Sequence, residues 1–223
     1  MPTPSNLATR LTRFSMSALE DGSAIASNAH TVTQLGKQLA LVSWECGEPP
    51  DLSNVSIEDV RSYLFFLEKS HYSIVCPDGS LLQMSFKVHR GKIAQHRLCY
   101  LPCPVLFDPA ELIEDSLYDV VERNLHSGNY DLLRYRGAVR FDYDPSASRV
   151  GHPASHLTLN YDCVRLPVNR NMDASTFLSF VDNNFIGTRE DMPRLALPIG
   201  ADPTDDVLAA NDRCAPHLAW HLA

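Results

Sequence analysis

The sequence lacks the features that mark membrane proteins and secreted proteins. None of its apolar runs approaches the roughly 20 residues that a helix needs to cross a bilayer. Residues 1–5 contain no basic stretch followed by an apolar one, so they do not resemble a secretory signal. We therefore expect a soluble, cytoplasmic protein that makes no contact with a membrane.

Glycine and positive charge are also scarce. The 223 residues include 10 glycines, which form neither a glycine-rich loop for nucleotide phosphates nor the Gly-x-Ser-x-Gly turn of α/β-hydrolases. The chain has 19 Lys and Arg against 27 Asp and Glu, and its formal net charge is −8. These deficits argue against a nucleotide-driven enzyme, an α/β-hydrolase and a protein that coats duplex DNA.

The order of apolar patterns predicts an α+β fold. Apolar residues recur at helical spacing in residues 7–19, 32–44 and 60–67, and helix-start signals stand at Asp108 and Asp173. Alternating patterns and turn signals predict strands at residues 72–76, 82–88, 93–101, 135–143 and 155–166. We expect a single domain in which helices pack on an antiparallel sheet, built from a meander and a strand pair.

This domain is expected to have three parts. Residues 1–54 form a helical N-terminal arm, which ends at the Gly-Glu-Pro-Pro breaker of residues 47–50. Residues 55–190 form the α+β core, and Ser56 is expected to cap its first helix. Residues 191–223 form a loop and a short closing helix.

The expected strand pair carries an unusual set of polar side chains. Side chains alternate between the two faces of a strand, so Arg140, Asp142 and Asp144 share one face of the first strand. One face of the second strand presents His156, Thr158, Asn160 and Asp162. A solvated sheet face is polar too, but Asp and Asn have poor strand propensity. We interpret this face as a candidate site, with a solvated sheet face as the alternative.

These side chains suit the chemistry of phosphodiesters. His156 is the candidate general acid or base, and Arg140 is the candidate clamp for an anionic phosphoryl group. Asp142 and Asp144 would orient the substrate or hold a divalent cation. The candidate substrate-binding residues are His152, Asn160, Arg97 and Thr158.

Two short patterns offer other sites. Residues 71–73 (His-Tyr-Ser) and 156–158 (His-Leu-Thr) match the elements that two-histidine phosphoesterases place on neighbouring strands. His96, Cys99 and Cys103 could supply half of a zinc site, but no second close Cys/His pair follows them. The 6 cysteines are scattered, mostly among apolar residues, which is typical of buried free thiols.

Three segments together resemble a known family. They are residues 95–104, 140–145 and 151–160, with supporting similarity at residues 78–83 and 177–185. Over about residues 56–190 the chain resembles the bacterial family catalogued as domain of unknown function twenty-two ninety. The resemblance implies no established activity, so the chemistry must come from the residues.

A looser similarity involves the same strand pair. The Arg-x-Asp-x-Asp-Pro strand of residues 140–145, followed by the His-Pro of residues 152–153, is similar to small prokaryotic toxin proteins of toxin–antitoxin pairs. Those toxins tend to keep a further His where residues 156–158 read His-Leu-Thr, so this chain departs from their pattern.

Two functions from different classes fit the sequence. The first is a toxin-like or defence-associated effector, a nuclease or phosphodiesterase that acts on RNA or another phosphodiester through His156. The second is a non-catalytic partner subunit of a multi-protein system, which binds a protein encoded nearby through its sheet or its N-terminal helices.

Overall fold

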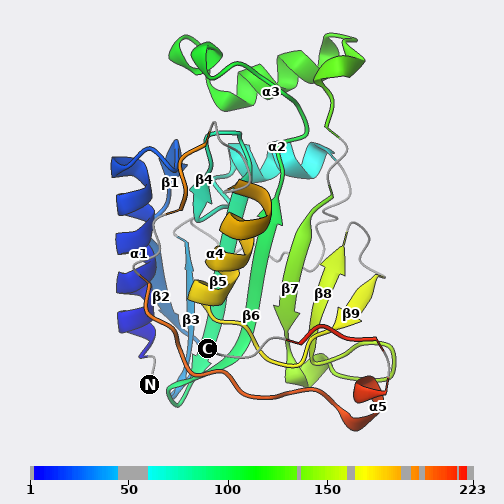
Figure 1. Ribbon diagram of the computed structural model, residues 1–223. Coiled ribbons are helices and arrows are strands. Elements are labelled where there is room, and N and C mark those ends of the chain that lie inside the picture. The colour runs from blue at the N-terminus through cyan, green and yellow to red at the C-terminus, as the bar shows by residue number, and fades with distance from the viewer. Residues whose placement is uncertain are drawn as a thin grey trace.

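A nine-stranded antiparallel sheet forms the centre of the part of the chain that the computed structural model describes (Figure 1). The described residues are 3–44, 60–134, 137–159, 164–186, 192–195, 199–214 and 216–219. The helices are α1 (Pro4–Glu20), α2 (Val60–Glu68), α3 (Leu117–His126), α4 (Ala174–Val181) and α5 (Ala210–Arg213). The strands are β1 (Ala26–Ser27), β2 (His30–Gln34), β3 (Leu39–Trp44), β4 (Ile74–Val75), β5 (Leu81–His89), β6 (Lys92–Leu101), β7 (Val139–Tyr143), β8 (Ser155–Leu159) and β9 (Arg165–Pro167). The α+β class and the antiparallel sheet predicted from the sequence are confirmed.

The β5–β6 hairpin organises this sheet. Its turn uses Arg90 and Gly91, which both have positive φ angles. On the far side of β5, its first residues pair with β4 and its last residues pair with β3. On the far side of β6, the order continues through β7 and β8 to β9. Among the described helices, none combines the length and the apolar character needed to cross a bilayer.

The two faces of the sheet bury different helices. Leu98, Phe141 and Leu157 point to the face that α1 and α4 cover, and α4 lies across the front of the sheet in Figure 1. Residues of opposite parity, such as Cys99, pack with Tyr63 of α2 in a second cluster. Because Arg140 and Asp142 alternate with Phe141, the polar residues of β7 lie on the face opposite α4.

The N-terminal arm is only partly helical. The helix predicted at residues 7–19 is confirmed as α1, which begins where the Thr3 hydroxyl accepts a hydrogen bond from the Asn6 N–H. The helix predicted at residues 32–44 is wrong, because β2 and β3 form an antiparallel hairpin there. The segment contains β-branched residues, and its second half pairs with β5, so pairing with the sheet overrides the helical spacing.

Several other element boundaries differ from the predictions. The strand predicted at residues 155–166 is two antiparallel strands, β8 and β9, with Thr158 opposite Arg165. The helix predicted from Asp108 starts with a capping box but forms only a 3-10 turn, Pro109–Ile113, and α3 follows as a separate helix. The predicted helix cap at Asp173 is confirmed. The predicted cap at Ser56 lies outside the described residues.

We predict that Gly79→Ala destabilises the protein by about 1–3 kcal/mol, measured as the free energy of unfolding in urea. Gly79 has a φ angle of +80°, and a Cβ there would lie 3.0 Å from Cys103 Cβ and Sγ. Gly36 is the matched control, because a Cβ at that position meets nothing within 4 Å. Equal unfolding free energies for the two variants would contradict the packing at this turn.

Candidate functional site

A buried carboxylate held by two guanidiniums lies at the centre of the polar face. Arg140 Nε donates to Asp142 Oδ2 at 2.6 Å, and Arg97 Nε donates to Asp142 Oδ1 at 3.0 Å. Asp142 is 8% exposed and Arg140 is 7% exposed. Burial alone would raise the pKa of Asp142, but the charges of Arg140 and Arg97 outweigh it and lower this pKa. The carboxylate therefore stays ionised at neutral pH.

His156 lies directly across from this carboxylate on the next strand. Its Nε2 is 3.7 Å from Asp142 Oδ2, and its Nδ1 is 2.9 Å from the carbonyl oxygen of Pro153. A carbonyl only accepts hydrogen bonds, so Nδ1 carries the proton and Nε2 keeps its lone pair in the neutral ring. Burial lowers the pKa of His156 against the opposing pull of Asp142. The result is a neutral imidazole whose basic nitrogen faces a carboxylate.

Three more polar residues border His156. The ring of His152 lies against the ring of His156, with centroids 4.8 Å apart and an interplanar angle of 74°. Thr158 lies two residues along β8, and Arg165 faces it from β9. The sequence pattern predicts one continuous strand over residues 155–166. It therefore does not predict that Arg165 lies beside Thr158. We call Arg97, Arg140, Asp142, His156, His152, Thr158 and Arg165 the polar cluster.

The structure brings most of the predicted site residues together. Arg140, Asp142, His156, Thr158, His152 and Arg97 all belong to the polar cluster. Asn160 lies outside the described residues. The buried state of Arg140, Asp142, His156 and Thr158 also shows that this part of the sheet is not a solvated outer face.

Asp144 makes the contacts of a turn cap. Its carboxylate accepts hydrogen bonds from the Ser146 N–H at 2.9 Å and from Gln95 Nε2 at 2.8 Å. It thereby begins the 3-10 turn Pro145–Ala147. Burial would raise the pKa of Asp144, but the hydrogen bonds from Ser146 and Gln95 outweigh it and lower this pKa. Its predicted catalytic role stays a prediction, since these contacts explain the residue through the fold.

The half zinc site suggested by the sequence does not form. His96 points to the α4 face of β6 and Cys99 to the opposite face, so the sheet separates the two side chains. Both ring nitrogens of His96 are engaged, since Nε2 accepts from the Met172 N–H at 2.8 Å and Nδ1 lies 3.3 Å from the Phe141 carbonyl oxygen. His96 is therefore a structural residue that ties the chain before α4 to the sheet.

The two-histidine arrangement is not formed either. His71 lies just before β4, and His156 lies in β8. Strands β5, β6 and β7 separate these elements, a span of about 19 Å at the usual strand spacing. The two His-x-Ser/Thr elements are thus not on neighbouring strands.

The polar cluster does not offer the ligands that a divalent cation prefers. Both oxygens of Asp142 accept hydrogen bonds from guanidinium groups, which repel a metal ion. Over the described ranges of the chain, no three His, Cys, Asp or Glu residues gather as a candidate metal site. The geometry favours an anionic ligand over a metal ion.

The buried histidines should make stability depend on pH. Burial lowers the pKa of both His30 and His96 from 6.5 to about 4. The unfolded chain therefore binds these protons first, and we predict that the free energy of unfolding decreases as the pH falls from 6.5 to 4. The expected loss is about 3 kcal/mol for each histidine, measured by urea unfolding at several pH values.

His96→Gln tests the share of one histidine in this loss. Gln can still accept a hydrogen bond from Met172 but does not titrate, so the pH-dependent loss should shrink by about 3 kcal/mol, the share of His96. His89→Gln, at the exposed end of β5, is the matched control and should leave the loss unchanged. An unchanged pH dependence in His96→Gln would contradict the assignment.

We also predict the direction in which two substitutions move the pKa of His156. Asp142→Asn removes the charge that raises this pKa, so the pKa falls further below its ordinary value of 6.5. Arg165→Met removes a charge that lowers it, so the pKa rises. Titration of the histidine ring signals by NMR measures both shifts. Two shifts of the same sign would refute the proposed charge environment of His156.

Comparisons with known proteins place this chain in a family. No curated protein and no solved structure matches it significantly. A family model described as "Uncharacterized conserved protein (DUF2290)" matches residues 24–220, which span β1–β9 and the whole polar cluster. The predicted resemblance over residues 56–190 is confirmed and extends further in both directions. The similarity to toxin proteins stays a prediction. The chain belongs to the DUF2290 family of uncharacterized conserved proteins.

Proposed function

We propose that the protein acts on RNA or another phosphodiester, as a toxin-like or defence-associated effector, with His156 as the general base. The observation that carries the proposal is the neutral His156 ring. A backbone carbonyl orients this ring, and its basic Nε2 lies 3.7 Å from the ionised carboxylate of Asp142. A base that is neutral at neutral pH and sits beside a carboxylate can accept a proton and keep the resulting charge stabilised.

Arg97 is the residue best placed to bind a phosphate group. Its Nε is occupied by Asp142, which holds the guanidinium in a defined orientation. Its side chain is 27% exposed, and its Nη atoms make no hydrogen bond within the described part of the chain. Arginine recognises phosphate through such an edge with two parallel N–H donors. Arg140 has a side chain that is only 9% exposed, so we assign it to positioning Asp142.

In RNA, a 2′-hydroxyl group is the natural nucleophile for this arrangement. His156 Nε2 takes the hydroxyl proton while the 2′-oxygen bonds to phosphorus. The bond from phosphorus to the 5′-oxygen breaks, and solvent protonates that oxygen. Asp142 stabilises the imidazolium, and Arg97 neutralises charge on the phosphoryl oxygens. Because His156 is 2% exposed, its Nε2 becomes accessible to a substrate only after a local rearrangement of its surroundings.

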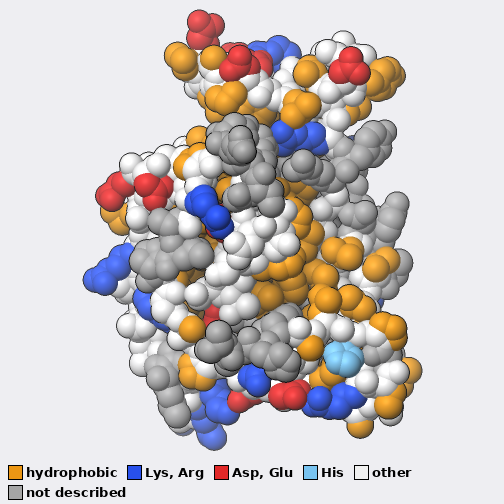
Figure 2. Space-filling view, in the orientation of Figure 1, with side chains coloured by type: hydrophobic (Ala, Val, Ile, Leu, Met, Phe, Trp, Pro, Cys, Tyr) orange, Lys and Arg blue, Asp and Glu red, His pale blue; other side chains and the backbone are white. Residues whose placement is uncertain are grey.

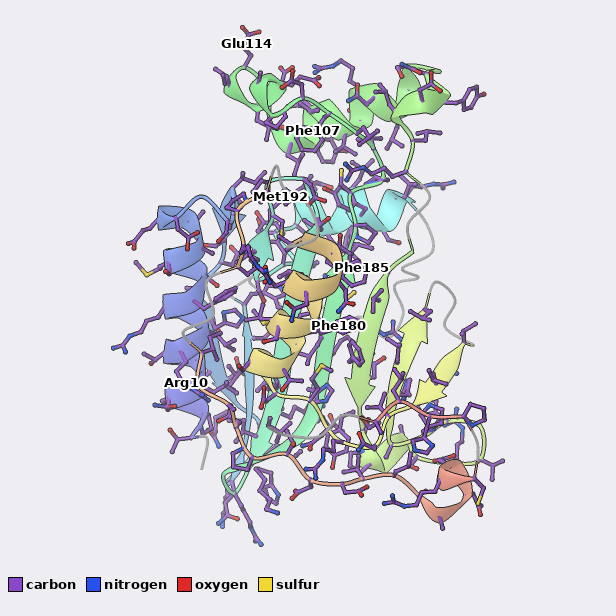
Figure 3. All side chains as sticks on the ribbon, viewed as in Figure 1. Arg10, Phe107, Glu114, Phe180, Phe185 and Met192 are labelled. Atoms are coloured by element: carbon purple, nitrogen blue, oxygen red, sulfur yellow. The ribbon has the colours of Figure 1, made fainter. Side chains whose placement is uncertain are left out.

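A second function is favoured by the lobe that contains the 3-10 turn Pro109–Ile113, α3 and Tyr130. This lobe stands off the sheet, and Glu114 lies at its outer edge (Figures 1 and 3). Ile113 is 85% exposed and Tyr130 is 82% exposed, and Figure 2 shows apolar side chains on this lobe. Exposed aromatic and aliphatic side chains are typical of protein interfaces. This observation supports the alternative of a non-catalytic partner subunit that binds a protein encoded nearby.

The decisive experiment compares RNA cleavage by the wild type, His156→Ala and His156→Gln. Loss of a general base should lower the rate by about 100-fold or more in both variants. His126→Ala is the matched control, because His126 is on α3, away from the polar cluster. RNA in which the reacting 2′-hydroxyl is replaced by hydrogen should not be cleaved.

Thermal unfolding shows which variants are folded, and His156→Gln keeps the test valid if the Ala variant is not. A folded His156 variant that cleaves RNA at the wild-type rate would refute the proposed base. A wild-type protein that cleaves no phosphodiester, but co-purifies with a neighbouring gene product at fixed stoichiometry, would favour the partner subunit.

A further inference from the structure

We infer that Arg165, Thr158 and His152 form a second site, which binds a tetrahedral oxyanion beside His156. This inference rests on the proposed function, because it names the substrate class of the same cluster. The second oxyanion would be another phosphate of the strand that reacts. The substrate would then be a strand with several phosphates, such as RNA, rather than a small phosphate ester.

Three hydrogen-bonding atoms without partners carry this inference. Thr158 is fully buried, and its Oγ1 has no hydrogen-bond partner among the residues that the structure describes. The same holds for Arg165 Nε and His152 Nδ1, which are buried atoms without a hydrogen-bond partner in the described part of the chain. A buried polar atom that lacks a partner costs about 1–3 kcal/mol, and folded proteins contain few of them. Three such atoms around one histidine indicate a site that a ligand completes.

The three residues face a common space. Thr158 and Arg165 are directly opposite each other on β8 and β9, so their side chains project from the same face of the sheet. The ring of His152 contacts the ring of His156, which lies on that face two residues from Thr158. The charge of Arg165 lowers the pKa of both histidines, after the larger effect of burial. The charge of Arg165 therefore acts on both rings.

The chemistry of these atoms selects an anion. Arg165 Nε can only donate, and the Thr158 hydroxyl can donate as well. His152 Nδ1 donates in one neutral tautomer and in the protonated ring. One tetrahedral oxyanion can accept from all three donors. A bound anion would also neutralise Arg165, which forms no ion pair within the described residues.

The position of this second site sets the length of the substrate. Arg97 is on β6 and Arg165 is on β9, three strand spacings across the sheet and two residues along it, so about 16 Å separates their backbones. His156 and Asp142 lie between them. An RNA strand that crosses the sheet would place one phosphate at Arg97 and another, further along the strand, at Arg165, with the reacting centre at His156.

Thr158→Val provides the sharpest test, because Val has the shape of Thr but no hydroxyl. In phosphate-free buffer the unpartnered hydroxyl destabilises the wild type, so the variant should unfold at a temperature about 2 °C higher. Inorganic phosphate should raise the unfolding temperature of the wild type and should raise that of Thr158→Val less. A lower unfolding temperature of Thr158→Val in phosphate-free buffer would mean that the hydroxyl is satisfied, and would overturn the inference.

Calorimetric titration with inorganic phosphate measures the site directly. Arg165→Met should weaken phosphate binding at least tenfold, while Arg13→Met, an equal charge change on the exposed face of α1, should leave it unchanged. No phosphate binding by the wild type, or equal binding by wild type and Arg165→Met, would refute the site. If Arg165→Met does not fold, Thr158→Val tests the same site, because it should bind phosphate more weakly than the wild type.

The two proposals fail in different ways. Phosphate binding that depends on Arg165, in a protein that cleaves no RNA, would refute the nuclease and leave the oxyanion site standing. RNA cleavage that depends on His156 but proceeds equally well in Arg165→Met would refute the second site alone.

Discussion

The register between β6 and β7 is the constraint on which the arrangement of this protein depends. It places Arg97 opposite Asp142, and the ion pair between them holds only in that register. A slip by one residue would turn Arg140 and Asp142 toward α4 and would turn Phe141 away from the main core. A buried carboxylate that loses its guanidinium partners is strongly unfavourable. The same pairing therefore aligns the sheet and assembles the polar cluster.

Local sequence patterns were enough to predict the fold class and to predict which polar side chains share one face of the sheet. Alternation alone assigned Arg140, Asp142, His156 and Thr158 to a common face, and the structure confirms this. The prediction of secondary structure failed where a helical spacing and a strand spacing of apolar residues both fit the same segment. Residues 32–44 satisfy a helical spacing, and only pairing with β5, more than 40 residues away, decides that they form strands. Arg165 was missed because residues 155–166 were predicted as one strand, although Asn160 and Asp162 are residue types that strands disfavour and turns favour.

Burial is the property of the site that composition could not predict. A row of Arg, Asp, His and Thr fits a solvated strand as well as a binding site, and the sequence leaves both open. The structure separates them, since these side chains are buried while Arg97 keeps an exposed edge. Within the ion-pair network the contrast separates Arg140, which is buried against Asp142, from Arg97, whose guanidinium keeps an exposed edge.

The unequal exposure of the two arginines on Asp142 has a consequence for ionic strength. Dissolved ions screen charges at the surface but reach a buried ion pair poorly. The strength of the Arg140–Asp142 ion pair is therefore nearly independent of added salt. The attraction between Arg97 and a polyanion would weaken steeply, because salt ions compete for the guanidinium and for the phosphates. Added salt would therefore weaken the proposed binding of a polyanion at Arg97 while the Arg140–Asp142 pair, and with it the packing around Asp142, stays intact.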